Sequence, residues 1–287
     1  MLARVMKYSV FIVLAIVLIL PMNCFAVSKR VKKKKCSMKP IKVYYDELTG
    51  KQFKPTKSEK KQATEIYQKM QDGDLRVRAS EYENLSRLYG IIETEYFPYE
   101  GCRCSAQLYG DEDDFLYFKK LNTQRAIQVN EEVKRKVQST IKQLKINKKT
   151  TQVKAINKIN QWICDNMSYD YQRAKDRKKT DYSDANYTPS IISGKGICGD
   201  YARTFTFLAN YCGIDSGCVI NKAVTHEYNL VKIANRTFYM DVCYNDGSKS
   251  NNYTLLSKSQ LKKRGHTIGR VIWYGGNSYY NTADAYN

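Results

Sequence analysis

The stretch from Gly194 to Ala202 constrains the fold more than any other part of this sequence. It is a glycine-rich loop that contains Cys198 and leads into an apolar repeat with spacings of 4, 3 and 4 residues. The repeat consists of Tyr201, Phe205, Leu208 and Cys212. Gly213 follows as a stop signal, so the pattern predicts an amphipathic helix that begins at Cys198.

A cysteine in the first turn of a helix is well placed for nucleophilic chemistry. The helix dipole favours its thiolate form, which is the form that attacks carbonyl groups. The N–H groups of the first turn have no acceptor within the helix, so they can stabilise a developing oxyanion. A cysteine taken alone is more often a small buried hydrophobe, and this is our interpretation of Cys164, Cys212 and Cys218.

A base for this thiol is predicted on a β-hairpin further along the chain. Two segments of alternating polarity, residues 225–233 and 237–243, flank a short turn at Ala234-Asn235 or Asn235-Arg236. Hairpin parity puts His226 and Asp241 on the same face, and the first of these turns makes them diagonal neighbours. The two side chains can then meet.

Cys198, His226 and Asp241 therefore form a candidate catalytic triad of nucleophile, base and orienting carboxylate. A single strand histidine is more often a packed residue than a catalyst, so the prediction depends on the joint arrangement. Three residues of these types at these places are much harder to explain by packing than any one of them.

Three motifs, in this order, resemble the transglutaminase-like superfamily of secreted bacterial proteins. They are Cys-Gly-Asp-Tyr-Ala from Cys198, His226 with an asparagine three positions later, and Tyr-Met-Asp ending at Asp241. The resemblance covers about residues 127–267, and a stretch that includes His266 is similar to a common tail of the family. It implies an α+β, papain-like fold, in which the cysteine-bearing helix packs on an antiparallel sheet that bears the histidine and the aspartate.

The resemblance also implies a reaction. The thiolate attacks a carboxamide carbonyl, ammonia or an amine leaves, and the acyl-enzyme is passed to an amine or to water. By motif match, Cys198, His226 and Asp241 inherit the roles of nucleophile, base and orienter. Cross-linking transferase, protease and amidase share this machinery, and the sequence does not choose among them.

Other site residues are less well defined by the resemblance. The oxyanion-stabilising side chain has several candidates, namely Trp162, Tyr169 and Tyr171. Tyr228 stands where the family commonly has an aromatic residue, often Trp, and Tyr228 and Asn229 are candidates for substrate binding. No cofactor or metal is expected, because the chain has two histidines, no Cys-x-x-Cys pair and no acidic cluster suited to calcium.

Residues 1–26 are predicted to be a signal peptide that is cleaved near Ala26. Arg4 and Lys7 precede an apolar run from Tyr8 to Leu20, which is shorter than the roughly 20 residues that a bilayer span needs. An uncleaved membrane anchor is the alternative, because the basic residues that follow oppose simple export. We expect a secreted protein or one associated with the cell envelope.

Beyond the signal peptide, the residue pattern divides the chain into three parts. Residues 27–57 are basic, have little periodic apolar content and are expected to be a flexible linker. Residues 58–126 form an N-terminal mixed α/β region of unknown role, and residues 127–287 form the transglutaminase-like domain.

Within these parts, hydrophobic periodicity predicts individual elements. A helix is expected from Ser58 to Gln71, and strands mixed with loops are expected between Leu75 and Phe118. Two further helices are indicated by apolar stripes that run through residues 133–144 and 151–167. A polar stretch from residue 172 to residue 186 is expected to be an exposed loop.

The chain is strongly basic, with a formal net charge of +20. Removal of Arg4 and Lys7 with the signal peptide would leave +18, and much of this charge lies between Lys29 and Lys35. Such density suits an anionic cell-wall polymer or a lipid surface, whereas nucleic acid is not expected, because no base-reading motif is present. A solvated tail that only aids solubility is the alternative.

The sequence thus predicts an exported transglutaminase-like thiol enzyme that acts on protein or peptide carboxamides through an acyl-enzyme. The alternative is a non-catalytic envelope-binding module that retains the fold. The 24 tyrosines and the basic segment would suit polymer contact. An intact triad argues against that alternative.

Overall fold

The computed structural model describes residues 29–46, 49, 51–72, 76–78, 81–99, 115–117, 123–176 and 188–272. The predicted signal peptide and residues 177–186 of the predicted exposed loop lie outside this set, whereas residues 172–175 at the start of that loop are helical. No helix among the described residues has both the length and the apolar character needed to cross a membrane.

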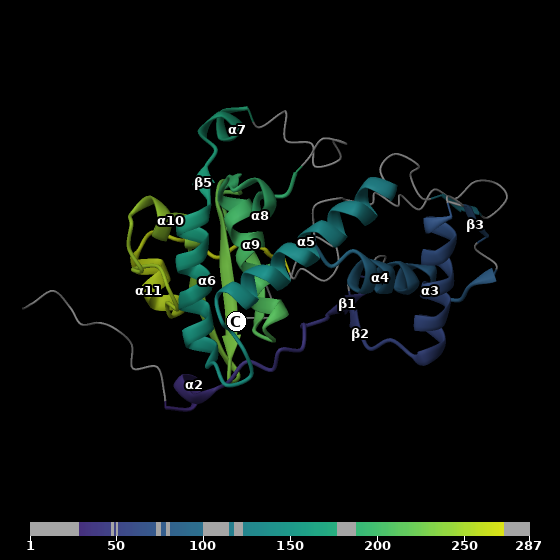
Figure 1. Cartoon of the computed structure of the whole chain (residues 1–287), viewed down its shortest axis with the longest axis horizontal. Helices are drawn as coiled ribbons and strands as arrows, with labels where there is room; N and C mark the ends of the chain where they lie inside the picture. Colours follow the sequence, from purple (N-terminus) through teal and green to yellow (C-terminus); the bar gives the residue numbers. More distant parts are fainter. Residues whose placement is uncertain are drawn as a thin grey trace, which may run out of the picture.

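The described helices and strands are distributed over the whole of this set (Figure 1). The helices are α2 (Lys29–Lys33), α3 (Lys57–Gln71), α4 (Leu85–Tyr96), α5 (Thr123–Gln143), α6 (Gln152–Asn166), α7 (Tyr171–Lys175), α8 (Ser190–Ser193), α9 (Cys198–Tyr211), α10 (Val242–Gly247) and α11 (Lys258–Lys263). The strands are β1 (Tyr44–Tyr45), β2 (Gln52–Phe53), β3 (Arg76–Arg78), β4 (Phe115–Tyr117), β5 (Ser168–Tyr169), β6 (Lys195–Gly196), β7 (Asp215–Ile220), β8 (Glu227–Ile233), β9 (Arg236–Met240) and β10 (Val271–Ile272).

A four-stranded antiparallel sheet, in the order β10-β7-β8-β9, is the centre of the C-terminal half. Helix α9 packs against β7 and β8, and every residue from Gly199 to Ala209 is buried. One buried side chain fastens the two layers together: Asn229 donates to the carbonyl oxygen of Ala202 at 2.8 Å and to the hydroxyl of Thr206 at 3.1 Å. The predicted α+β fold, with the cysteine helix on an antiparallel sheet, is confirmed.

The other side chains of the strands form a second, smaller apolar cluster. Tyr228 and Leu230 from β8 and Tyr239 from β9 pack there with Leu256 and Leu261, the last of which belongs to α11. Because side chains alternate along a strand, β8 sends Asn229 toward α9 and its neighbours Tyr228 and Leu230 into this cluster. Both surfaces of the hairpin strand are therefore buried.

The hairpin turn is Ala234-Asn235, the first of the two predicted turns. Ile233 pairs with Arg236, and the two turn residues have φ of 51° and 64°. Two successive left-handed residues match the twist of the flanking strands. The second strand is shorter than predicted, because Asp241 leaves the ladder to cap α10, so residues 242 and 243 are helical instead of extended.

The predicted helices around this core are present, but the helix predicted from the stripe at residues 133–144 begins about ten residues earlier than that stripe. The stripe of α5 buries Val129, Val133, Val137 and Ile141, and the helix begins at Thr123, so it runs through the expected domain boundary at residues 126–127. Helix α6 is capped by Thr151, and α3 is capped by Thr56 and not by Ser58. Figure 1 shows α5 reaching from α3 and α4 toward the sheet.

One secondary-structure prediction in the N-terminal region is wrong. Residues 85–96, expected among strands and loops, form α4, and every residue from Leu88 to Thr94 is buried. Because the helix is covered on several sides, its apolar residues do not repeat with the spacing of a helix that buries one face. In the described part of residues 75–118, the strands are β3 and β4, which pair with each other.

The basic segment after residue 28 also differs from the flexible linker that we expected. Val31 and Cys36 are buried, and the carbonyl oxygen of Lys34 accepts from the N–H of Gln152 at 2.7 Å. This bond satisfies a donor in the first turn of α6, so the segment lies along the core. The lysines from Lys32 to Lys35 remain exposed.

Candidate active site

Cys198 is the first residue of α9 and lies half-buried at a pocket of about 880 Å³. A short parallel pairing of β5 with β6 forms one wall, since Tyr169 pairs with Gly196 two residues before the thiol. The pocket lining includes Tyr169, Tyr171, His226, Tyr244 and His266. The structure therefore brings the predicted nucleophile and base into one cavity.

The first turn of α9 is fixed by a buried ion pair. Asp200 accepts the N–H of Ile197 at 2.8 Å and Nη1 of Arg173 at 2.7 Å on the same oxygen, Oδ2. A side chain at position 196 would collide with Asp200, because a Cβ there would lie 2.6 Å from the Cβ of that residue. The glycine before the cysteine is therefore required by close packing, and the helix terminus that carries the thiol is held firmly.

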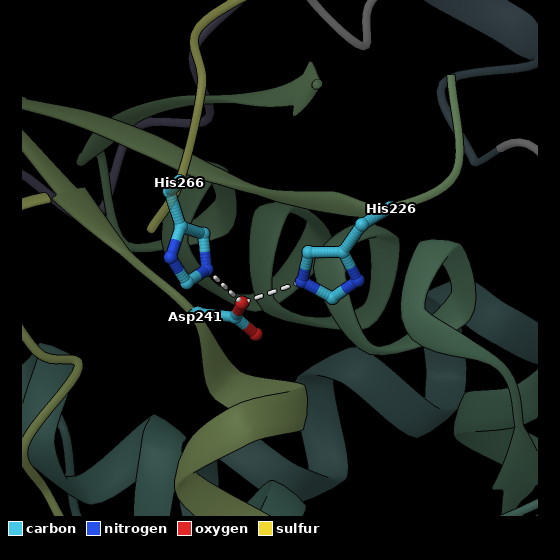
Figure 2. A group of neighbouring side chains, drawn as sticks. All are labelled: His226, Asp241 and His266. Carbon is cyan, nitrogen blue, oxygen red and sulfur yellow. Dashed lines mark hydrogen bonds and ion pairs between the residues drawn. The ribbon is translucent and has the colours of Figure 1, made fainter. Parts of the chain in front are cut away.

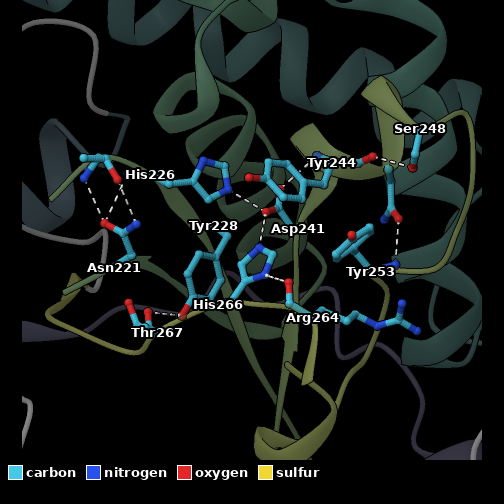
Figure 3. A network of polar contacts seen from close by, with 12 residues as sticks. Asn221, His226, Tyr228, Asp241, Tyr244, Ser248, Tyr253, Arg264, His266 and Thr267 are labelled. Atoms are coloured by element: carbon cyan, nitrogen blue, oxygen red, sulfur yellow. Dashed lines mark hydrogen bonds and ion pairs between the residues drawn. The ribbon is translucent and has the colours of Figure 1, made fainter. Parts of the chain in front are cut away.

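His226 and Asp241 are joined by a hydrogen bond of 2.6 Å between Nε2 and Oδ2. The histidine lies immediately before β8, and its N–H donates to Oδ1 of Asn221 at 3.2 Å. Asp241 is fully buried, and its second oxygen accepts the N–H of Tyr244 at 2.9 Å as the cap of α10. Figure 3 shows these contacts around the carboxylate.

The two groups shift each other's ionisation. Burial of the His226 ring opposes its protonation, but hydrogen bonds with Asp241 and then with Cys198 raise the pKa of His226 to about 10. Burial would raise the pKa of the Asp241 carboxyl, but its hydrogen bonds with His226 and His266 hold that pKa below the ordinary value. Because Nε2 of His226 faces the carboxylate, Nδ1 is the nitrogen left for the thiol. The arrangement favours an imidazolium beside Cys198.

A second histidine reaches the same carboxylate. Nε2 of His266 lies 2.8 Å from Oδ2 of Asp241, and Figure 2 shows both imidazole rings directed at this one oxygen. No role was predicted for His266, although it is the only other histidine of the chain and lies in the stretch that is similar to a common tail of the superfamily. That resemblance does not by itself indicate a contact with Asp241.

The same three side chains have donor atoms within 4.8 Å of one another, which raises the question of a metal ion. The nitrogen–oxygen distances of 2.6 and 2.8 Å are those of hydrogen bonds. An ion with bonds of about 2.0 Å to each atom would force these atoms further apart. The cluster is therefore a hydrogen-bonded network in this structure.

The oxyanion candidates are separated by the fold. Tyr169 and Tyr171 line the pocket with Cys198, and their rings lie 5.0 Å apart. Trp162 is buried on α6 beneath the ammonium group of Lys136 and does not line the pocket. Of the three predicted candidates, Tyr169 and Tyr171 therefore lie at the pocket with the thiol and Trp162 does not, and the oxyanion role stays a prediction.

The two predicted substrate-binding residues are not placed for that role. Tyr228 is 1% exposed and donates its hydroxyl to the carbonyl oxygen of Thr267 at 3.0 Å. Asn229 is fully buried against α9. Both are packing residues, because strand β8 turns them into the two apolar layers and away from the pocket.

Several pocket residues were not found from the sequence. Tyr244, Tyr253 and Arg264 come from α10 and the segments that follow it, and Cys243 is a second thiol in the cavity. Burial raises the pKa of the Cys243 thiol, so it does not share the environment that favours a thiolate at Cys198. These residues follow the triad in the chain and have no motif of their own.

Comparison with known proteins agrees with this geometry. Residues 139–251 match the sequence profile of the transglutaminase-like superfamily, a range that includes the triad and ends before His266. No curated protein matches the chain.

Two solved structures show limited likeness. One is assigned as a cysteine protease from Cytophaga hutchinsonii, with 13% identity and a TM-score of 0.31, over 47% of this chain and 40% of that one. The other is a TGase, with 17% identity and a TM-score of 0.33, over 51% of this chain and 38% of that one. The chain thus spans about two fifths of the length of each solved chain.

Proposed function

Residues 139–251 form a transglutaminase-like superfamily core, and from this premise we propose that the protein is a thiol enzyme that acts on protein or peptide carboxamides. Its product is an acyl-enzyme that passes to an amine or to water. One observation carries the proposal: the hydrogen-bonded pair of His226 and Asp241 meets the N-terminal cysteine of α9 in a pocket.

The chemistry follows from these groups. The Cys198 thiolate attacks the carboxamide carbon, a C–S bond forms, and the carbonyl electrons move to oxygen. As the C–N bond breaks, His226 gives its proton to the departing nitrogen and ammonia or an amine leaves. An incoming amine or water then attacks the thioester, His226 takes its proton, and the thiolate departs. Asp241 holds the imidazole in the orientation that both proton transfers need.

Two features can stabilise the oxyanion in this scheme. The backbone N–H groups of Cys198 and Gly199, the first two residues of α9, precede the first bonds of the helix and lie next to the thiol in the chain, whereas the N–H of Asp200 already bonds to Ile197. Tyr169 is held in the same wall by its pairing with Gly196, and its phenol is the side chain that we assign as the additional donor. Both sets of oxyanion donors are supplied by residues of this chain.

The rim of the pocket supports a polymeric substrate. Three large apolar side chains stand out as exposed among the described residues: Tyr171 at 73%, Val224 at 69% and Tyr244 at 44%. Tyr171 and Tyr244 line the pocket, and Val224 precedes the lining residue Thr225 with a φ of 55°, which is strained for a β-branched residue. We call these three residues the substrate rim. Their exposure suits apolar side chains on either side of a peptide carboxamide.

Substitutions in the substrate rim are expected to weaken binding without changing the thiol. Tyr171→Ser and Val224→Asn together should raise KM for a glutamine-containing peptide by about thirtyfold, since each loses roughly 1 kcal/mol of apolar contact. Alkylation of Cys198 by iodoacetamide, which is too small to span the rim, should stay at the wild-type rate. An unchanged KM would mean that the substrate does not contact this rim.

The reaction itself is tested with Cys198→Ala. The protein and the variant are incubated with a glutamine-containing protein and a fluorescent primary amine, and amine incorporation, ammonia and new chain termini are followed. Incorporation that is lost in the variant supports transfer, whereas ammonia or new termini alone support hydrolysis. If the wild type gives none of the three signals, and Cys198 is not labelled selectively, the proposal fails and a non-catalytic envelope-binding module takes its place.

Export and surface attachment complete the proposal. The apolar run before Ala26 supports secretion or association with the cell envelope, and the exposed lysines from Lys32 to Lys35 suit an anionic wall polymer or lipid surface. Because this basic segment lies along α6, a bound polymer would be held close to the catalytic core.

A further inference from the structure

Both histidines of the chain end on a single oxygen atom. His226 reaches Oδ2 of Asp241 at 2.6 Å and His266 reaches it at 2.8 Å, and they come from segments 40 positions apart. A carboxylate oxygen has no hydrogen to give, so each ring donates an N–H to it. The chemistry outlined above uses only the first of these donors.

The second donor helps to stabilise the negative charge of the buried Asp241 carboxylate. Other carboxylates near the pocket pair with permanent cations, as Asp200 does with Arg173 and Asp246 does with Lys249. Asp241 is fully buried, and among the described residues its side-chain partners are the two imidazoles in place of a permanent cation. A buried carboxylate that depended on His226 alone would lose its charged partner each time His226 gave up a proton.

His266 is held rigidly for this contact. Helix α11 ends in a left-handed Gly265, with φ of 82°, and the N–H of His266 bonds back to the carbonyl oxygen of Leu261 at 3.3 Å. The ring then fits between aromatic side chains, with centroids 5.1 Å from Tyr228, 5.1 Å from Tyr244 and 5.6 Å from Tyr253. Its side chain is 4% exposed, so it contacts Asp241 and not bulk solvent.

We propose that His266 is a positioning residue that fixes the Asp241 carboxylate while His226 exchanges its proton with the reacting groups. This inference rests on the proposed function, since it assigns a role in the same reaction. His226 moves a proton through Nδ1, whereas the Nε2–H of His266 stays on Oδ2 throughout. Asp241 therefore keeps one fixed donor, and its direction toward His226 does not depend on the charge of His226.

A matched pair of substitutions separates this role from simple packing. Gln and Met have similar length and flexibility, but only Gln carries an N–H near the position of Nε2. We expect His266→Met to lower the rate at which iodoacetamide alkylates Cys198 at pH 7 by about tenfold, and His266→Gln to stay within about threefold of wild type. Labelling at Cys198 is quantified on its own peptide by mass spectrometry, because other thiols are present.

The pH profile of alkylation is a second test, because a change in packing alone would not alter how the rate depends on pH. In His266→Met the rate should rise more steeply between pH 6 and pH 9 than in the wild type or in His266→Gln, because the imidazolium beside the thiol is held less well. The titratable groups that face Asp241 besides the two histidines are Tyr228, Tyr244 and Cys243, and none of them is changed.

A failure of the positioning role of His266 can be distinguished from a failure of the proposed function. If Gln and Met variants lose rate equally, or if neither does, the positioning role is overturned even when His226→Gln abolishes the enhanced alkylation. Faster alkylation in His266→Met would also overturn it, since His266 would then compete with His226 for the oxygen. If His266→Met fails to fold, His266→Gln alone decides. The positioning role predicts that the Gln variant keeps nearly the wild-type alkylation rate, because its N–H replaces that of the imidazole. A folded Gln variant with tenfold slower alkylation would contradict that role.

Discussion

Replacing His226 with glutamine is expected to lower the alkylation rate of Cys198 at pH 6 by about a hundredfold, since an ordinary cysteine with a pKa near 8.5 is almost wholly protonated there. In the wild type, hydrogen bonds with Asp241 and Cys198 keep the imidazole protonated across the neutral range, with a pKa of about 10. The alkylation rate of the variant should therefore rise steeply toward pH 9, and the difference in rate between the two proteins should shrink as it does so. A flat profile in both proteins would contradict the ion pair.

The raised pKa of His226 also makes the free energy of unfolding depend on pH. The pKa of His226 lies near 6.5 in the unfolded chain and about 10 in the folded protein, so protonation stabilises the native state fully below pH 6.5. This contribution is lost as the pH rises from about 6.5 to about 10. The free energy of unfolding of the wild type should thus fall relative to that of His226→Gln across this window, as measured by denaturant titration at several pH values. A constant difference would show that His226 does not titrate with a raised pKa.

The parts of the site that could be predicted from sequence are those fixed by local periodicity. Helix α9 begins at Cys198 as expected, because a glycine-rich loop followed by an apolar repeat leaves few alternatives. The contact of His226 with Asp241 follows from hairpin parity once the turn is at Ala234-Asn235. Both results need only the geometry of one helix and one pair of strands.

The parts that could not be predicted depend on contacts between distant segments. His266 meets Asp241 only because α11 folds back over the hairpin, and no spacing in the sequence encodes that return. Tyr228 and Asn229 share a strand with the base, but their burial is decided by which layers cover the sheet. Helix α4 was mistaken for strands for the same reason, because its apolar residues face several neighbours and lack one clear stripe.

The N-terminal segment shows the limit of composition. A run of lysines predicts a solvated tail, and the lysine side chains after Val31 are indeed exposed. However, Val31 and Cys36 anchor the backbone between them to the core, and two buried residues are too few to form a periodic signal. The lysine run therefore predicted exposed side chains correctly, whereas the flexible backbone that it suggested is wrong.

Substituting Asp241 with asparagine is expected to have the largest effect on both folding and chemistry. An amide oxygen in the place of Oδ2 would leave the NH2 group against the N–H of Tyr244, and the opposite orientation would place the NH2 group against both imidazoles. In either case at least one donor is left without an acceptor in a fully buried place. The free energy of unfolding at pH 7 should fall by about 3 kcal/mol, the usual cost of breaking a buried pair from one side. Turnover of a glutamine-containing substrate should fall by about a thousandfold or more, because His226 loses its orientation and the charge that stabilises its imidazolium.

A second aspartate provides the matched control for this substitution. Asp215 begins β7 outside the pocket, and burial raises the pKa of its carboxyl, so its charged form is disfavoured where that of Asp241 is favoured. Asp215→Asn should therefore leave stability at pH 7 unchanged or slightly increased. The cost of Asp241→Asn should also shrink in acid, because a lowered carboxyl pKa contributes stability above the unfolded value near 3.9 and loses it as the pH falls below. Equal losses in the two variants would mean that Asp241 is only another buried carboxyl. The triad would then lack the electrostatic basis that the two histidine contacts of Asp241 imply.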